Sequence, residues 1–269
     1  MIPTNEVQEN APLTVAEFYD ALAPDYDTMT GFQKRFVQER PFFRLLAEKY
    51  KIRVALDAGC GTGFHSLLLA QLGVQMTGVD VSAAMIQEAR RHAKELSLPV
   101  HFIEAQNAEL GRIFDSRFDA VFSLGNTTAH LLSDDALLHT FESYHAILKP
   151  KGVLFLQNLN YDRILANKER VQSIKEIGGT TFVRFYDYTD QLVSFNILTI
   201  EREGGIVQQS MRTIQLRPLQ STHLVEMMHR SNFGNVRLFG GIAMDDYDPQ
   251  TSKDLVVIAE RMDADSSRN

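Results

Sequence analysis

The stretch Leu56-Asp57-Ala58-Gly59-Cys60-Gly61-Thr62-Gly63 decides the fold of this chain. A short apolar run, residues 54–56, leads into it, and an apolar segment with helical spacing, residues 67–72, follows the glycines. The pattern predicts a strand, a sharp glycine turn and the first turn of a helix. Backbone N–H groups at such a junction face a ligand, and glycine lets that ligand approach the main chain closely. We therefore expect a binding site at this turn.

A second acidic side chain, Asp80, follows the next predicted strand (residues 74–79). It stands about 20 residues after the first glycine, where a carboxylate binds the ribose hydroxyls of a nucleoside. A dinucleotide-binding loop has the pattern G-x-G-x-x-G, and Phe64 stands here in place of its third glycine. Asp57 would repel a pyrophosphate, whereas it suits a nucleoside that carries an ammonium group and no phosphate. These charges favour S-adenosylmethionine (SAM) over NAD as the ligand.

Strands and helices alternate along the first 160 residues. Apolar runs predict strands at residues 54–56, 74–79, 100–103, 118–122 and 153–156. Two more strands are expected at residues 236–239 and 255–259. This rhythm predicts an α/β fold: a doubly wound, mostly parallel, seven-stranded Rossmann-like sheet with helices on both faces.

Two helices are expected before the first strand, at residues 14–23 and 33–49. Proline lacks the N–H that a helix interior needs, so we expect Pro24 to end the first helix and Pro41 to divide the second. The inward side chains of the second helix should be Phe36, Val37, Phe42, Leu45 and Leu46.

The alternation breaks after the fifth strand. Residues 180–217 are rich in β-branched and aromatic side chains, and Gly204-Gly205 fits a hairpin turn. We expect a small antiparallel β insertion, lid-like, at about residues 160–220, within a single domain that spans residues 1–269. Alternation along a strand places Arg184, Tyr186 and Tyr188 on one face, which either lines a pocket or meets solvent.

Composition limits the partners of the chain. Its 269 residues are 44% hydrophobic and carry a net charge of −7, so the surface repels a phosphate backbone and we expect no nucleic acid partner. No apolar run has the roughly 18 residues of a membrane span, so we expect no membrane partner. The single cysteine, Cys60, fits a reducing compartment, and we expect a cytoplasmic protein. Asn126 and Asn158, which follow strands four and five, are neutral and not carboxylates, and no histidine pair has zinc-ligand spacing, so we expect no metal.

The glycine loop, together with Gly78-Val79-Asp80-Val81-Ser82 and Met85, resembles the Rossmann-like (class I) SAM-dependent methyltransferases. The resemblance covers about residues 18–160 by motif. It implies SAM as the cofactor, bound across the carboxyl ends of the first four strands. The cofactor-binding residues that it implies are Asp57, Gly59, Gly61, Gly63, Asp80, Val81, Met85, Gln106, Asn107 and Leu124, with Tyr26 covering the cofactor. By the same resemblance, residues of about 14–50 form an N-terminal helical flap.

A narrower resemblance joins the chain to the glycine/sarcosine N-methyltransferases. It rests on residues 124–131, Leu-Gly-Asn-Thr-Thr-Ala-His-Leu, on residues 160–165, Asn-Tyr-Asp-Arg-Ile-Leu, and on the antiparallel insertion. That family holds the carboxylate of glycine with an arginine just before the Asn-Tyr-Asp segment, and Leu159 stands there in this chain. A neutral leucine cannot pair with a carboxylate. The resemblance therefore implies a small-molecule amine as methyl acceptor, and not glycine itself.

Roles at the acceptor side follow from that resemblance. Asn126 is expected to orient the acceptor, and His130 is either a general base or the holder of a structural hydrogen bond. The residues expected to line the acceptor pocket are Asn126, Tyr161, Arg184, Tyr186 and Tyr188. With Tyr26, Asn126 and His130 form the catalytic set that we expect.

Other functions stay open at this point. The chain could methylate oxygen instead of nitrogen, or bind the cofactor as a catalytically silent sensor. A nucleotide-linked oxidoreductase is disfavoured by the missing third glycine of the loop. The sequence does not set the identity of the acceptor, the use of a general base or the oligomeric state.

Overall fold

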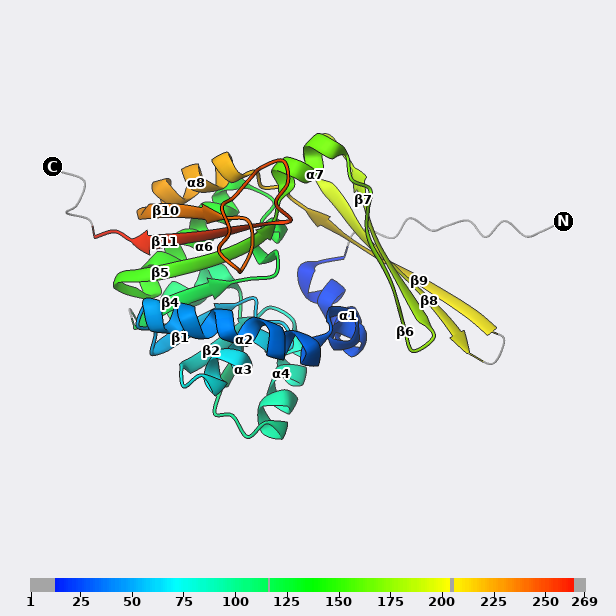
Figure 1. Cartoon of the computed structure of the whole chain (residues 1–269), viewed down its shortest axis with the longest axis horizontal. Helices are drawn as coiled ribbons and strands as arrows, with labels where there is room; N and C mark the ends of the chain where they lie inside the picture. Colours follow the sequence, from blue (N-terminus) through cyan, green and yellow to red (C-terminus); the bar gives the residue numbers. More distant parts are fainter. Residues whose placement is uncertain (1–12, 116, 204–205, 264–269) are drawn as a thin grey trace.

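The computed structural model describes residues 13–115, 117–203 and 206–263, and it contains two sheets (Figure 1). The larger has seven strands in the order β10-β11-β5-β4-β1-β2-β3. Its strands are β1 (Val54–Ala58), β2 (Gln75–Asp80), β3 (His101–Glu104), β4 (Phe118–Ser123), β5 (Leu148–Leu159), β10 (Phe233–Phe239) and β11 (Asp254–Arg261). All neighbouring pairs are parallel except those that β11 makes with β5 and β10. The expected mostly parallel seven-stranded sheet is thus confirmed.

Helices cover both faces of this sheet. They are α2 (Phe32–Lys49), α3 (Phe64–Gln71), α4 (Ala83–Glu95), α5 (Leu110–Ile113), α6 (Asp134–Ile147) and α8 (Ser221–Arg230), with short 3-10 turns η1 (Asn107–Glu109) and η2 (Thr127–His130). Successive residues of one strand enter different cores: Leu56 packs with α6 and α8, whereas Ala55 packs with α2 and α3. The sheet is therefore buried on both faces. The loops at the carboxyl ends of its strands are left uncovered by these helices.

The two N-terminal helices differ from the expectation at both prolines. Helix α1 runs from Val15 to Thr30 with Pro24 inside it and ends at Gly31, whose φ of 75° gives a left-handed C-cap. Helix α2 contains Pro41 without division. A proline removes the N–H that would bond to the carbonyl four residues earlier, and its ring crowds that carbonyl. Burial of residues beyond Pro24, such as Met29, offsets this cost and favours continuing the helix.

Two apolar side chains of α2 also differ from the expectation. Val37 and Leu45, expected inward, are 79% and 65% exposed, while Phe43 on the inner side is 1% exposed. The helix face that packs on α3 is therefore rotated relative to the one inferred from the sequence.

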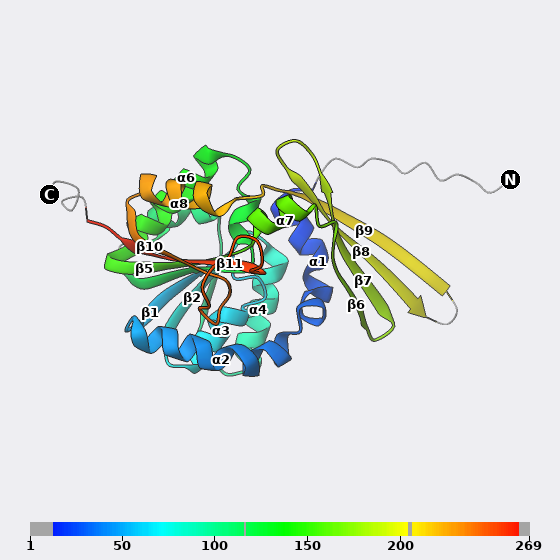
Figure 2. The same ribbon diagram turned by 45° about the horizontal axis from the view of Figure 1, so that its top comes forward.

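The second sheet is the expected antiparallel insertion after β5. Helix α7 (Tyr161–Asn167) leads into four strands in the order β6-β7-β8-β9, with bounds Val171–Ile177, Thr180–Tyr188, Val193–Glu203 and Ile206–Leu216. The turn expected at Gly204-Gly205 lies outside the described residues. One face of this sheet packs on α1, which lies between the two sheets in both views (Figures 1 and 2).

Two aspartates fasten α1 to the main sheet. Asp20 accepts hydrogen bonds from the hydroxyl of Ser82 at 2.5 Å and from the N–H of Ala84 at 3.0 Å, at the start of α4. Asp27 accepts one from the Thr62 hydroxyl at 2.6 Å and pairs with His92 Nε2 at 3.0 Å. The helix is therefore held against the glycine loop and the end of β2. Among the described residues, none of the helices is long and apolar enough to cross a membrane.

Candidate active site

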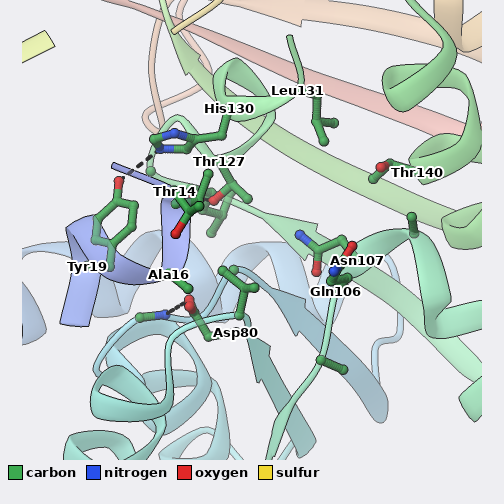
Figure 3. A pocket seen from close by; sticks show the side chains of 18 of the residues that line it. Thr14, Ala16, Tyr19, Asp80, Gln106, Asn107, Thr127, His130, Leu131 and Thr140 are labelled. Atoms are coloured by element: carbon green, nitrogen blue, oxygen red, sulfur yellow. Dashed lines mark hydrogen bonds between the residues drawn. The ribbon is translucent and has the colours of Figure 1, made fainter. Parts of the chain in front are cut away.

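A cavity of about 440 Å³ opens at the carboxyl ends of four parallel strands (Figure 3). Its walls come from the glycine loop after β1, the end of β2, the loop after β3, the loop after β4 and helix α1. Nine of the expected site residues line it: Tyr26, Gly59, Gly61, Asp80, Val81, Gln106, Asn107, Leu124 and His130. Cavities that bind ligands of nucleoside size and above measure roughly 300–1,000 Å³, so this one has the size for a nucleoside.

The glycine loop can form because its backbone enters the left-handed region. Gly59 has a φ of 79°, and a Cβ there would lie 2.5 Å from Cγ2 of Thr127. Gly63 has a φ of 85°, and a Cβ there would meet Phe102 at 2.9 Å. Glycine is thus required at Gly63 for packing under the loop, although Gly63 itself does not line the cavity.

Asp80 is the carboxylate inside the cavity. One of its oxygens accepts the N–H of Gly61 at 2.8 Å and the other accepts the N–H of Ser82 at 2.9 Å. Burial raises the pKa of this carboxyl, and the two N–H groups oppose that shift. The carboxylate is therefore held at a fixed angle against the glycine loop, with lone pairs left to accept from ligand hydroxyls.

The loop after β3 offers further acceptors. The buried Oδ1 of Asn107 has no hydrogen-bond partner among the described residues, and Figure 3 shows Asn107 and Gln106 across the cavity from His130. A buried unpaired acceptor is costly, so it indicates that a ligand donor belongs there. An adenine amino group is such a donor. Together with Asp80 and the close backbone of the loop, this set fits SAM.

Asp57 lies apart from the cavity. It is 1% exposed and accepts a hydrogen bond from the Ser66 hydroxyl at 2.7 Å. Burial raises the pKa of this carboxyl, while His65 and Ser66 act in the opposite sense. Besides burial, the charge of Asp57 raises the pKa of Asp80, so Asp57 acts on a carboxyl group of the cavity that it does not itself line. Met85 is also fully buried behind the cavity wall.

A second cavity, of about 170 Å³, adjoins the first between α1, the insertion and the ends of β5 and β11. Asn126, Arg184 and Tyr186, all expected at the acceptor side, line it. Four residues line both cavities: Tyr19, Tyr26, Gly125 and His130. A group bound in the smaller cavity can therefore reach a ligand in the larger one only past these residues.

His130 is held by Tyr19 at this junction. The Tyr19 hydroxyl lies 3.0 Å from His130 Nε2, and His130 Nδ1 has no partner among the described residues. Burial lowers the pKa of His130 to about 4 and raises that of Tyr19 well above its usual value. Both side chains are therefore neutral at pH 7, and which of the two donates depends on the tautomer of the imidazole.

The other acceptor-side residues differ in exposure to the cavity. The amide of Asn126 donates to the Tyr161 hydroxyl at 2.9 Å and accepts the N–H of Leu159 at 3.1 Å, so both of its ends are already used. Tyr161 stands behind Asn126, and Tyr188 bonds to the Glu169 carbonyl at 2.5 Å; neither lines the cavity. Arg184, Tyr186 and Tyr188 share the inner face of the sheet, so the solvent alternative for that face is wrong.

Sequence reasoning missed Tyr19, one of the four residues that line both cavities. Tyr19 and Tyr26 stand seven residues apart, which is two helical turns and one face. Extending α1 through Pro24 would have revealed this shared face. Asp254 and Gln157, which line the smaller cavity from β11 and β5, carried no sequence signal.

One cluster of metal-ligand types exists among the described residues, formed by Asp27, Glu88 and His92. It lies outside both cavities. His92 is engaged there by Asp27 and by the Thr62 carbonyl at 3.0 Å from Nδ1, so its ring nitrogens serve the contact between α1 and α4.

Comparisons with known proteins agree with this geometry. A family model described as a methyltransferase domain matches residues 55–152. The glycine/sarcosine N-methyltransferase of Halorhodospira halochloris is 31% identical over 225 residues, which are 83% of this chain and 81% of that protein.

Solved structures share the fold. A SAM-dependent methyltransferase from Clostridium acetobutylicum matches with a TM-score of 0.78 and 16% identity, covering 91% of this chain and 99% of the other. The SAM-bound structure of an amino pentose methyltransferase from Micromonospora echinaspora matches with a TM-score of 0.62 and 18% identity, covering 95% and 100%. With the cavity that fits SAM and the relative of matching length, these findings mean that the chain belongs to the class I SAM-dependent methyltransferases and methylates a small molecule.

Proposed function

We propose that the methyl acceptor is a small amine and that the protein methylates it on nitrogen. The observation that carries this proposal is that His130, the histidine that lines both cavities, is a weak base engaged by Tyr19. Burial lowers the pKa of His130 to about 4, and its Nε2 is already engaged by the Tyr19 hydroxyl. A group this weakly basic cannot remove a proton from an alcohol efficiently.

An amine needs no such base. An aliphatic amine with a pKa near 10.4 has a neutral fraction at pH 7 of about one in a few thousand, and that fraction rises tenfold per pH unit. Bound SAM supplies a methyl group on a positively charged sulfur, which is already an activated leaving group. The remaining contribution of the protein is alignment, which can supply about 7–11 kcal/mol. Relatives named for glycine, sarcosine and amino pentose substrates support an amine acceptor.

We also propose the roles of the site residues. Asp80 binds the ribose, Asn107 or Gln106 accepts from the adenine amino group, and Gly59 and Gly61 lie along the methionine part. Asp57 acts on the ammonium group through its charge. Tyr26 covers the cofactor, and Asn126 positions the acceptor wall through Tyr161. In this proposal, α1 and α2 form the flap and the insertion forms the lid of a single domain.

Turnover of an amine panel at several pH values tests the proposal. With S-adenosylhomocysteine release as readout, kcat/KM for an amine is expected to rise about tenfold per pH unit from pH 7 until the amine pKa is reached. Hydroxyl compounds of the same size serve as matched acceptors and are expected to give no product. Methylation of hydroxyl compounds alone would point to the O-methyltransferase alternative, and cofactor binding without any turnover would point to a sensor.

A further inference from the structure

We propose that the acceptor is an amine that also carries a carboxylate, and that Arg184 binds this carboxylate from the insertion. The inference rests on the proposed N-methylation, because it names the substrate class of the same site. It concerns the smaller cavity, where the sequence left the chemistry of the acceptor open.

Arg184 is oriented toward that cavity by its own sheet. It pairs with Ser173 in the register of β6 and β7, and its Nε donates to the Ser173 hydroxyl at 2.7 Å. Among the described residues, this is the one hydrogen bond of the guanidinium, and no carboxylate lies within ion-pair distance. The Nη1 and Nη2 groups therefore remain available to a ligand in the cavity that Arg184 lines.

The charge of Arg184 needs a partner. The side chain is half-buried, and burial lowers its pKa, yet a guanidinium stays protonated in proteins. Lys175 has two positively charged neighbours: burial lowers its pKa, and the charges of Arg184 and Arg35 lower it further. Lys175 donates to the Met29 carbonyl and Arg35 pairs with Glu39, so Arg184 is the cation left facing the cavity. A ligand carboxylate would give the half-buried guanidinium of Arg184 an ion-pair partner through a bidentate hydrogen bond.

The smaller cavity is also lined by an acidic side chain. Asp254 lines the same cavity from β11, and no ion pair joins it to Arg184. Leu159, the residue that replaces the strand-five arginine of the glycine/sarcosine enzymes, lines the cavity as a neutral group. The cation thus comes from the insertion instead of from β5. A guanidinium and a carboxyl group that line one cavity of about 170 Å³ suit a compact zwitterion such as a small amino acid.

Matched pairs of acceptors test the substrate class. Glycine, alanine and β-alanine are compared with glycinamide, methylamine and ethylamine at equal concentrations of SAM. We expect kcat/KM to be about 100-fold higher for the carboxylated amines, as found when one partner of a buried charge pair is removed.

Substitution of the arginine tests the residue. Arg184→Met is expected to raise the acceptor KM about 100-fold, with kcat within a few-fold and SAM affinity unchanged. Arg184→Lys should recover part of this loss, because it restores charge without the fork geometry. Arg202→Met, an exposed arginine of the same sheet, is the matched control and should behave as the parent protein.

A binding measurement separates this inference from the proposed function. Acetate is titrated calorimetrically into the complex with S-adenosylhomocysteine, and its heat of binding should be present in the parent and in Arg202→Met but absent in Arg184→Met. If no amine is methylated, the proposed function fails while acetate binding still decides the role of Arg184. Equal turnover of carboxylated and uncharged amines, or binding of inorganic phosphate in place of acetate, would overturn the inference and leave N-methylation standing.

Discussion

The hydroxyl of Tyr19 lies 3.0 Å from Nε2 of His130, and this contact joins α1 to the loop after β4 where the two cavities meet. Burial lowers the pKa of His130 to about 4, so the imidazole in this contact is neutral at pH 7.

Acid should destabilise the protein through His130. Its pKa is about 4 in the folded state and about 6.5 when unfolded, so the unfolded state binds more protons between these values and stability falls as pH drops from 6.5 to 4. Glutamine cannot titrate in this range. Between pH 6.5 and 4 we therefore expect the free energy of unfolding, measured with urea, to fall by about 1–3 kcal/mol less in His130→Gln than in the parent protein. Parallel curves for the two proteins would contradict the prediction.

Asp80 should control cofactor binding. SAM and S-adenosylhomocysteine at 100 times their Kd are expected to stabilise the parent protein by about 2.7 kcal/mol, or about 5–10 °C in Tm, and NAD and NADP to have no effect. Asp80→Ala should abolish the ligand-induced rise in Tm, because it removes the carboxylate that we propose to bind the ribose. Asp115→Ala, at a fully exposed position, is the control. Stabilisation by NAD instead of SAM would show that the ligand assignment is wrong.

Two glycines separate backbone strain from crowding. Gly63 and Gly73 both have a positive φ, of 85° and 88°, but a Cβ at Gly73 meets nothing within 4 Å while one at Gly63 meets Phe102 at 2.9 Å. Gly73→Ala should cost about 1–2 kcal/mol from the left-handed backbone alone. Gly63→Ala should cost about 1–3 kcal/mol more from overpacking. Denaturant unfolding of both variants measures the difference, and equal losses would exclude the packing term.

The contact between Asp20 and α4 should hold the flap closed. Asp20→Asn weakens the bonds to the Ser82 hydroxyl and the Ala84 N–H at a helix N-terminus, where a negative charge is favourable. We expect the variant to be about 1–2 kcal/mol less stable. We also expect about a tenfold weaker affinity for S-adenosylhomocysteine, because Tyr19 and Tyr26 belong to α1 and line the larger cavity. Asp25→Asn on the same helix is the matched control, and an unchanged affinity in Asp20→Asn would argue against a role of α1 in closure.

The parts of this fold that local sequence determines were predictable. The turn at Gly59 and the carboxylate of Asp80 belong to one βαβ unit, so a spacing of about 20 residues was enough to place them at one sheet edge. The path of α1 depends on Asp20 and Asp27 reaching residues of α4 and the glycine loop, which are far along the chain. A local rule about Pro24 could not include those contacts.

The acceptor side shows the same limit. Alternation placed Arg184 and Tyr186 on a shared face, but a two-residue period does not say which face is covered. Asp57 shows a related ambiguity: the pattern around it indicated a ligand, and the structure pairs its carboxylate with Ser66 below the loop. The functional roles of these residues remain predictions that the variants above address.

The insertion after β5 furnishes one wall of the smaller cavity and none of the residues that line the larger one. Substitutions in β7 or β8 can therefore remodel the smaller cavity while the larger one keeps its lining. If the smaller cavity binds the acceptor as proposed, a library that seeks a new acceptor specificity should begin with the residues of β7 and β8 that line it.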